Sequence, residues 1–219
     1  MSNAEIIENT ISYVKDILRD AEGGHDWFHI ERVFKNTLLI AKEEDADILV
    51  VSLGALLHDI ADSKFHGGDE TIGPRMARNF LKSILVPPET ISHVEKIITN
   101  ISFKNNIDNS NNSFTSKELD IVQDADRLDA IGAIGIARAF HYGGFTNSTL
   151  YDPEISPSLN MTKEVYKKAR NPTINHFYEK LLLLKDKMNT ATGKKLAKER
   201  HQFMIKFLEH FYSEWDGKT

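Results

Sequence analysis

Apolar residues recur at helical spacing along almost the whole chain, and this periodicity restricts the fold more than any other feature. Ile30, Val33, Thr37 and Ala41, for example, follow one another at intervals of three and four residues, as one face of an α-helix requires. No segment shows the convincing alternation of apolar and polar residues that marks a half-buried β-strand. We therefore expect an all-α fold.

The length of 219 residues suits one large globular domain. We expect a single domain over residues 1–219, with a helical-bundle core at about 20–140 and a C-terminal helical extension at about 160–216. Two segments are rich in turn-forming residues and predict loops, at 104–113 and 145–159. The expected helices cover about 6–18, 29–41, 48–60, 72–84, 88–101, 116–128, 130–141, 175–188 and 194–215.

The chain has nine histidines and no cysteine. The absence of thiols excludes a disulfide scaffold, a thiolate zinc site and a cysteine nucleophile. Any metal site must therefore be built from imidazole nitrogens and carboxylate oxygens.

The 32 acidic and 27 basic side chains give a formal net charge of −5. Binding to nucleic acid or to a membrane surface needs a concentrated basic face, so we expect neither partner. The longest nearly apolar run, residues 48–57, is far shorter than the ~20 residues that span a bilayer. No signal peptide is visible, and we expect a cytoplasmic protein.

His58 and Asp59 directly follow this most apolar stretch of the chain. Burial of a carboxylate among leucine and isoleucine side chains costs several kcal/mol unless it is paired or binds a cation. One helical step of about 100° separates the two residues, so they would reach one ion only if it lay off the helix between them. A helix-terminal aspartate beside a hydrogen-bonded core histidine is the alternative.

Two further clusters combine histidine or aspartate with helical patterning. His25-Asp26 stands just before a predicted helix that Asp26 can cap, and His29 lies within its first turn. The stretch from Asp124 to Asp129 holds three acids in a largely apolar helix, where a buried acid again needs a cation.

Together these residues follow the order H…HD…D, and the sequence resembles the HD-domain metal-dependent phosphohydrolases. The flanking motifs resemble one bacterial branch of that superfamily, small stand-alone nucleoside triphosphate pyrophosphohydrolases. The resemblance runs from His25 to Trp215. It implies an HD-type helical bundle and a metal site formed by His29, His58, Asp59 and Asp126. The motifs that carry it are HDxxHxxRV from His25, HDIADSK from His58, DADRLDAIG from Asp124 and GKxLAxERHxFM from Gly193.

A set of two imidazoles and two carboxylates suits one divalent ion, Mn²⁺ first, with Mg²⁺, Fe²⁺, Ni²⁺ or Co²⁺ as alternatives. Binuclear members of the superfamily carry extra histidines, a role for which His66 and His93 are the candidates. Four protein ligands leave positions on an octahedral ion for water and a phosphate oxygen.

The resemblance also suggests a catalytic acid and a phosphate-binding set. Asp62 is the candidate general base, because related nucleotide hydrolases carry an acid at this place; the alternative is an ion pair with Lys64 or Arg32. Substrate phosphates are the expected ligands of His25, Lys64, Lys104 and Arg127. Solvated lysines and a structural ion pair of Arg127 with Asp124 or Asp129 are the alternatives.

The implied reaction is hydrolysis of a nucleoside triphosphate to its monophosphate and pyrophosphate, through water activated by the metal. The same chemistry on another phosphorylated substrate, as a nucleotidase or phosphodiesterase, is one alternative. A metal- or nucleotide-sensing module without turnover and a purely structural helical protein are the others. Oligomeric state is not readable from these patterns.

Overall fold

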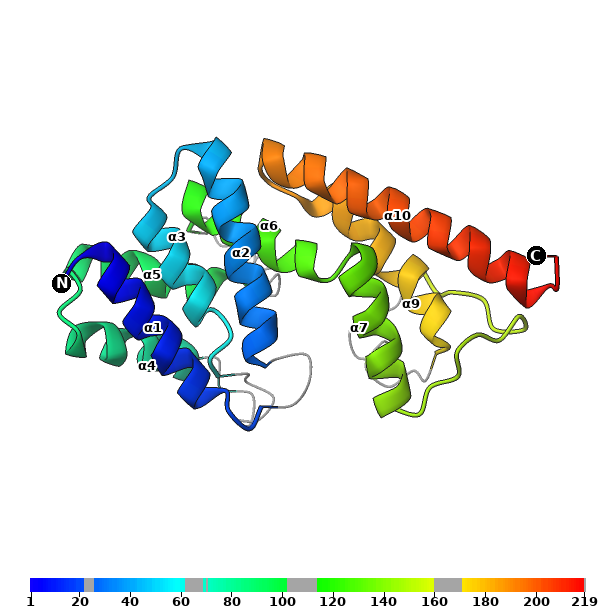
Figure 1. Cartoon of the computed structure of the whole chain (residues 1–219), viewed down its shortest axis with the longest axis horizontal. Helices are drawn as coiled ribbons and strands as arrows, with labels where there is room; N and C mark the ends of the chain where they lie inside the picture. The colour runs from blue at the N-terminus through cyan, green and yellow to red at the C-terminus, as the bar shows by residue number, and fades with distance from the viewer. Residues whose placement is uncertain (22–25, 62–68, 70, 102–113, 160–170, 219) are drawn as a thin grey trace. The chain divides into compact units, whose positions relative to one another are not determined.

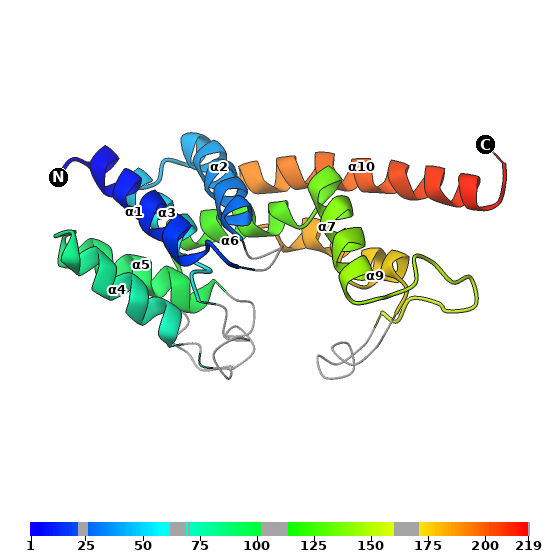
Figure 2. The same cartoon turned by 60° about the horizontal axis from the view of Figure 1, so that its bottom comes forward.

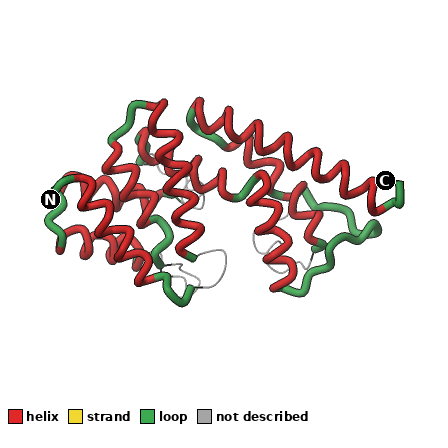
Figure 3. Tube along the Cα trace, in the orientation of Figure 1, coloured by secondary structure: helices red, strands yellow, loops and turns green. Residues whose placement is uncertain are grey.

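The computed structural model describes residues 1–21, 26–61, 69, 71–101, 114–159 and 171–218. Its regular structure is helical throughout, and the described residues contain no β-strand (Figure 3). The predicted all-α fold is confirmed. Within the same residues, no helix combines the length and the hydrophobicity that a membrane crossing needs.

The chain forms two compact units. Unit 1 comprises residues 1–126 and 189–193, and unit 2 comprises residues 127–188 and 194–219. The boundaries fall inside two helices, α6 (Lys117–Asp129) and α10 (Ala191–Trp215), so each of these has residues in both units.

Unit 1 is built around α3 (Ile48–Leu57), which packs against α1 (Asn3–Ile17), α2 (Trp27–Glu44) and α5 (Pro88–Asn100). The fourth helix, α4 (Ile72–Ser83), lies beside α5 (Figure 2). All residues of α3 after Ile48 are buried, as the apolar run predicts.

Local capping sets both ends of α3. The Asp47 carboxylate accepts hydrogen bonds from the backbone N–H groups of Leu49 and Val50 and starts the helix. The helix ends at Leu57 and not near residue 60, so His58 and Asp59 lie in the turn that follows it. Here the His58 ring, through Nδ1, donates to the Ala55 carbonyl at 2.8 Å, and such a bond competes with continuation of the helix.

Unit 2 contains α7 (Gly132–Phe145), α9 (Thr173–Glu179), the 3-10 helix η3 (Leu181–Lys187) and most of α10. Two predicted boundaries were wrong. The α7 helix runs through the glycine pair at 143–144; a Cβ at Gly143 would lie 2.2 Å from Thr173 Oγ1, so the glycine permits close packing. The predicted helix over 175–188 is α9 followed by η3, whose three-residue turn places Leu181 and Leu184 on one side.

Aromatic rings make much of the core of unit 2. The Phe207 ring lies 5.9 Å from the rings of both Phe140 and Phe177, measured between centroids. Phe177 is fully buried, whereas Phe203 on the same long helix as Phe207 is exposed. On α10, Phe207 and Phe211 thus pack against other aromatic rings, whereas Phe203 does not belong to this core.

Candidate metal centre

The first histidine of the candidate site lies in the opening turn of α2. The Asp26 carboxylate caps this helix and accepts a hydrogen bond from the His29 backbone N–H at 3.0 Å. The His29 side chain is 4% exposed. The cap predicted from the HD dipeptide is confirmed, and it fixes the helix turn that carries the imidazole.

The second histidine caps the C-terminal end of α3, and its side chain is 5% exposed. A carbonyl oxygen only accepts, so the 2.8 Å contact with Ala55 requires the proton on Nδ1 of His58. The lone pair of Nε2 is then available to a cation. Metal-binding histidines are commonly oriented by such a bond from the other ring nitrogen.

The third member, Asp126, lies on α6. Its Oδ1 is 3.5 Å from Nε2 of His29 and 3.9 Å from Nε2 of His58. The two imidazole rings meet edge to face, with centroids 5.5 Å apart. One ligand atom from each of the three residues lies within 4.8 Å of the other two.

These separations fit a cation better than direct hydrogen bonds. Both carboxylate–imidazole distances exceed the usual 2.7–3.2 Å of a hydrogen bond. Ligand atoms bound at about 2.1 Å to one ion lie about 3 to 4 Å apart. The Asp126 side chain is 42% exposed, so the group is open on that side. Two imidazoles and one carboxylate thus provide a nitrogen–oxygen donor set that a divalent metal ion fits.

A polar contact ties together the helices that carry His29 and Asp126. The buried Asn36 side chain of α2 donates through Nδ2 to the backbone carbonyl of Ala125 on α6, at 3.4 Å. Because Ala125 directly precedes Asp126, this contact lies beside a proposed ligand position.

The structure describes two of the remaining predicted site residues, Asp59 and Arg127. Asp59 is half-buried in the turn beside His58 and is not a member of the three-residue group. Its role as a ligand stays a prediction. Arg127 donates through its guanidinium to the Lys187 carbonyl at 2.6 Å. Asp62, His25, Lys64 and Lys104 lie outside the described residues.

The two histidines considered as extra ligands do not enlarge the described group. His93 lies with Nε2 3.0 Å from Ser116 Oγ and 3.5 Å from Glu118 Oε2. His66 lies outside the described residues.

Sequence reasoning placed Asp124 among the acids of a largely apolar helix and as a possible ion-pair partner of Arg127, but it gave residues 189–193 no role in the site. Asp124 is fully buried on α6, two residues before Asp126, and accepts hydrogen bonds from Asn189 and Thr190. A threonine just before a predicted helix is a capping signal that could have drawn attention to the segment. The sequence offers no signal for its pairing with Asp124.

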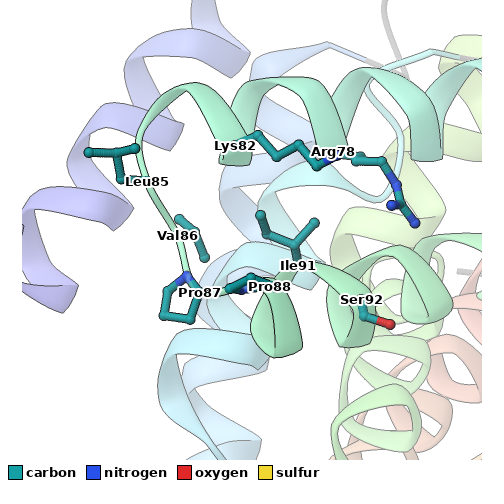
Figure 4. A pocket seen from close by; sticks show the side chains of 8 residues that line it. All are labelled: Arg78, Lys82, Leu85, Val86, Pro87, Pro88, Ile91 and Ser92. Atoms are coloured by element: carbon teal, nitrogen blue, oxygen red, sulfur yellow. The ribbon is translucent and has the colours of Figure 1, made fainter.

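Two hollows on the surface are lined by residues outside this group. One, of 590 Å³ in unit 1, is formed where α4 turns into α5 (Figure 4). The other, of 270 Å³, lies in unit 2 beside Tyr151, Tyr178 and Tyr212. Neither contains a predicted site residue, and in the first the Arg78 guanidinium is paired with the Glu95 carboxylate.

Comparison with known proteins connects this geometry to a family. Residues 27–131 match the model of the HD domain. The protein YpgQ of Bacillus subtilis is 36% identical over 223 residues, which cover 99% of this chain and 97% of YpgQ.

Two solved structures cover almost the whole chain. An HD-superfamily hydrolase from Bacillus thuringiensis has a TM-score of 0.79 and 41% identity, over 98% of this chain and 99% of its own. The crystal structure of B. subtilis YpgQ in complex with ADP has a TM-score of 0.76 and 34% identity, over 98% and 97% of the respective chains.

Proposed function

The chain belongs to the HD-domain superfamily of metal-dependent phosphohydrolases, and on that premise we propose that it hydrolyses nucleoside triphosphates to the monophosphate and pyrophosphate. The observation that carries the proposal is the group of His29, His58 and Asp126, whose ligand atoms lie within 4.8 Å of one another. Family membership agrees with the resemblance seen in the sequence.

The proposed ligands of the ion are His29, His58, Asp126 and, from the turn after α3, Asp59. When bound there, a divalent cation supplies Lewis-acid charge at a phosphoryl oxygen and lowers the pKa of a water molecule. Mn²⁺ is the proposed ion, with Mg²⁺, Fe²⁺, Ni²⁺ and Co²⁺ as alternatives that the same donors accept.

The side chains of the protein have separate tasks in this proposal. The bond from Nδ1 of His58 to Ala55 holds the ring with Nε2 directed to the ligand group. Asp62 takes a proton from the attacking water. His25, Lys64, Lys104 and Arg127 contribute positive charge or hydrogen bonds to the phosphates.

The oxygen of water joins the α-phosphorus, the bridging bond from the α-phosphorus to the β-phosphate oxygen breaks, and pyrophosphate leaves. A nucleotide substrate is supported by the B. subtilis relative, whose crystal structure contains ADP.

Hydrolysis in ¹⁸O-labelled water tests both the substrate and the bond. Purified full-length protein with Mn²⁺ is incubated with a panel of nucleoside mono-, di- and triphosphates, and the products are separated. We expect pyrophosphate in amounts equal to the monophosphate, with the label in the monophosphate. Orthophosphate as the product from the panel would favour a nucleotidase instead.

A matched pair of variants separates this site from a contaminating activity. His58→Gln removes an imidazole of the ligand group, and His210→Gln makes the same chemical change at an exposed position of α10. We expect loss of turnover only in His58→Gln. Nucleotide binding without turnover in the wild-type protein would support a sensing module and contradict the proposal.

A further inference from the structure

The start of α10 belongs to the same compact unit as the candidate metal centre. Residues 189–193, here called the α10 start segment, belong to unit 1, whereas the rest of α10 belongs to unit 2. The segment is capped by Thr190, whose Oγ1 accepts a hydrogen bond from the backbone N–H of Gly193 at 2.9 Å.

Asp124 of α6 is the main partner of this segment. Its carboxylate is fully buried and accepts hydrogen bonds from the backbone N–H groups of Asn189 and Thr190 and from Thr190 Oγ1, each at 2.8 Å. Charge-assisted bonds of this kind offset the cost of burying a carboxylate. The positive end of the α10 dipole, at its N-terminus, adds to the attraction.

The contact between Asp124 and the α10 start segment requires a glycine at position 193. A Cβ on Gly193 would lie 2.3 Å from Oδ2 of Asp124, so a larger residue cannot occupy this position without displacing the carboxylate. The neighbouring side chains are also paired, because Asn189 donates through Nδ2 to Oε1 of Gln123 at 3.0 Å.

The segment is hydrogen-bonded to two of the helices that carry proposed metal ligands, α6 and α2. Asp124 and Asp126 are two residues apart on α6, which places their side chains about 200° apart around the helix. Asp126 therefore turns toward the histidines while Asp124 turns toward residues 189–193. On α2, which carries His29, Glu44 accepts a hydrogen bond from the Thr192 N–H at 2.8 Å.

We propose that Asp124, Thr190 and Glu44 are positioning residues that hold Asp126 in place for the metal ion through the α10 start segment. The proposal rests on the proposed role of Asp126 as a metal ligand. The hydrogen bonds from the α10 start segment to Asp124 fix how α6 is rotated about its axis and how close it lies to that segment. The position of the Asp126 carboxylate, two residues further along α6, depends on both.

Binding of Mn²⁺ to the full-length protein, measured by titration below the unfolding temperature of every variant, tests this inference. Thr190→Val keeps the shape of the side chain and removes Oγ1, and we expect about tenfold weaker Mn²⁺ binding, the scale seen when partners of metal ligands are removed. Thr190→Ser restores the hydroxyl and is expected to restore the affinity.

A control variant distinguishes positioning from a general loss of stability. Thr10 on α1 is also fully buried and donates through Oγ1 to the Ile6 carbonyl at 2.8 Å. Thr10→Val therefore deletes the same group in the same kind of setting. We expect it to lower the unfolding temperature and leave the Mn²⁺ affinity unchanged.

Two different failures can be told apart. Wild-type Mn²⁺ affinity in folded Thr190→Val overturns the positioning role and leaves the metal centre standing. Absence of Mn²⁺ binding in the wild-type protein overturns the metal centre and the inference with it. If Thr190→Val does not fold, Glu44→Ala serves instead; about threefold weaker binding supports the inference, and unchanged binding overturns it.

Discussion

Histidines of low exposure have different surroundings in the two units of the chain. His29 in unit 1 places Nε2 3.5 Å from the Asp126 carboxylate, with His58 beside it. His176 in unit 2 loses solvent contact near the cationic Lys180, and desolvation, with a smaller contribution from that charge, lowers its pKa to about 4. The comparison shows that low exposure alone does not make a histidine a metal-ligand candidate; His29 is one because a carboxylate and a second imidazole, those of Asp126 and His58, lie close to its ring.

Removal of that carboxylate charge tests the comparison with the largest expected effect. Asp126→Asn keeps the shape of the side chain but lowers its affinity for a cation. We expect Mn²⁺-dependent hydrolysis to fall by roughly three orders of magnitude, because a metal ion supplies several kcal/mol of transition-state stabilisation. Initial rates at one fixed Mn²⁺ concentration, the same for both proteins, measure the loss.

Asp16→Asn is the matched control for this variant. Asp16 is exposed on α1, where its carboxylate pairs with Arg19. Its replacement is expected to leave the rate unchanged. Equal rates in Asp126→Asn and the wild type would contradict the assignment of the site.

We also expect the free energy of unfolding to fall in acid because of His176 in unit 2. The folded-state pKa of His176 is about 4 and its ordinary value is 6.5, so between these pH values the unfolded chain binds a proton that the folded chain excludes. The stability associated with His176 is therefore present above pH 6.5 and is lost as the pH falls toward 4. The loss amounts to roughly 3 kcal/mol.

Urea unfolding at pH 7 and at pH 4.5, with the wild type and His176→Gln side by side, measures this contribution. We expect the wild-type protein to lose more stability than the variant on acidification, because glutamine does not titrate. The same pH dependence in both proteins would show that His176 has no such role.

The smallest expected effect concerns the helix cap next to His29. Asp26→Ala removes the acceptor of the His29 N–H and is expected to cost about 1 kcal/mol of unfolding free energy in the absence of metal. Asp26→Ser, which restores a capping oxygen, should recover most of it. Chemical unfolding in EDTA measures both variants, and a fully stable Asp26→Ala would show that the cap contributes nothing.

Much of the fold of unit 1 could be predicted because its signals are local. Asp26 and Asp47 each cap a helix with bonds to residues two or three positions away, and both starts were expected from the sequence. In unit 2 the glycine pair at 143–144 did not end a helix. Gly143 is needed there because Thr173 approaches the helix closely, and the local sequence pattern does not indicate this contact.

In the candidate site, too, sequence motifs identified some residues and missed the contacts between distant segments. The resemblance supplied His29, His58 and Asp126, and the structure brings them together. The pairing of Asp124 with Thr190 joins positions 66 residues apart, so spacing along the chain carries no trace of it. Sequence reasoning left Arg127 a substrate ligand or an ion-pair partner, and the structure adds a bond to the Lys187 carbonyl.

The central claim is that one divalent ion binds between His29, His58 and Asp126. A crystal structure of the full-length protein grown with Mn²⁺, with data collected at the manganese absorption edge, tests it most directly. We predict a single anomalous peak about 2.1 to 2.2 Å from Nε2 of both histidines and from an Asp126 oxygen, with an Asp59 oxygen as the fourth protein ligand. A well-ordered site without a peak, or a peak bound by other residues, would contradict the account.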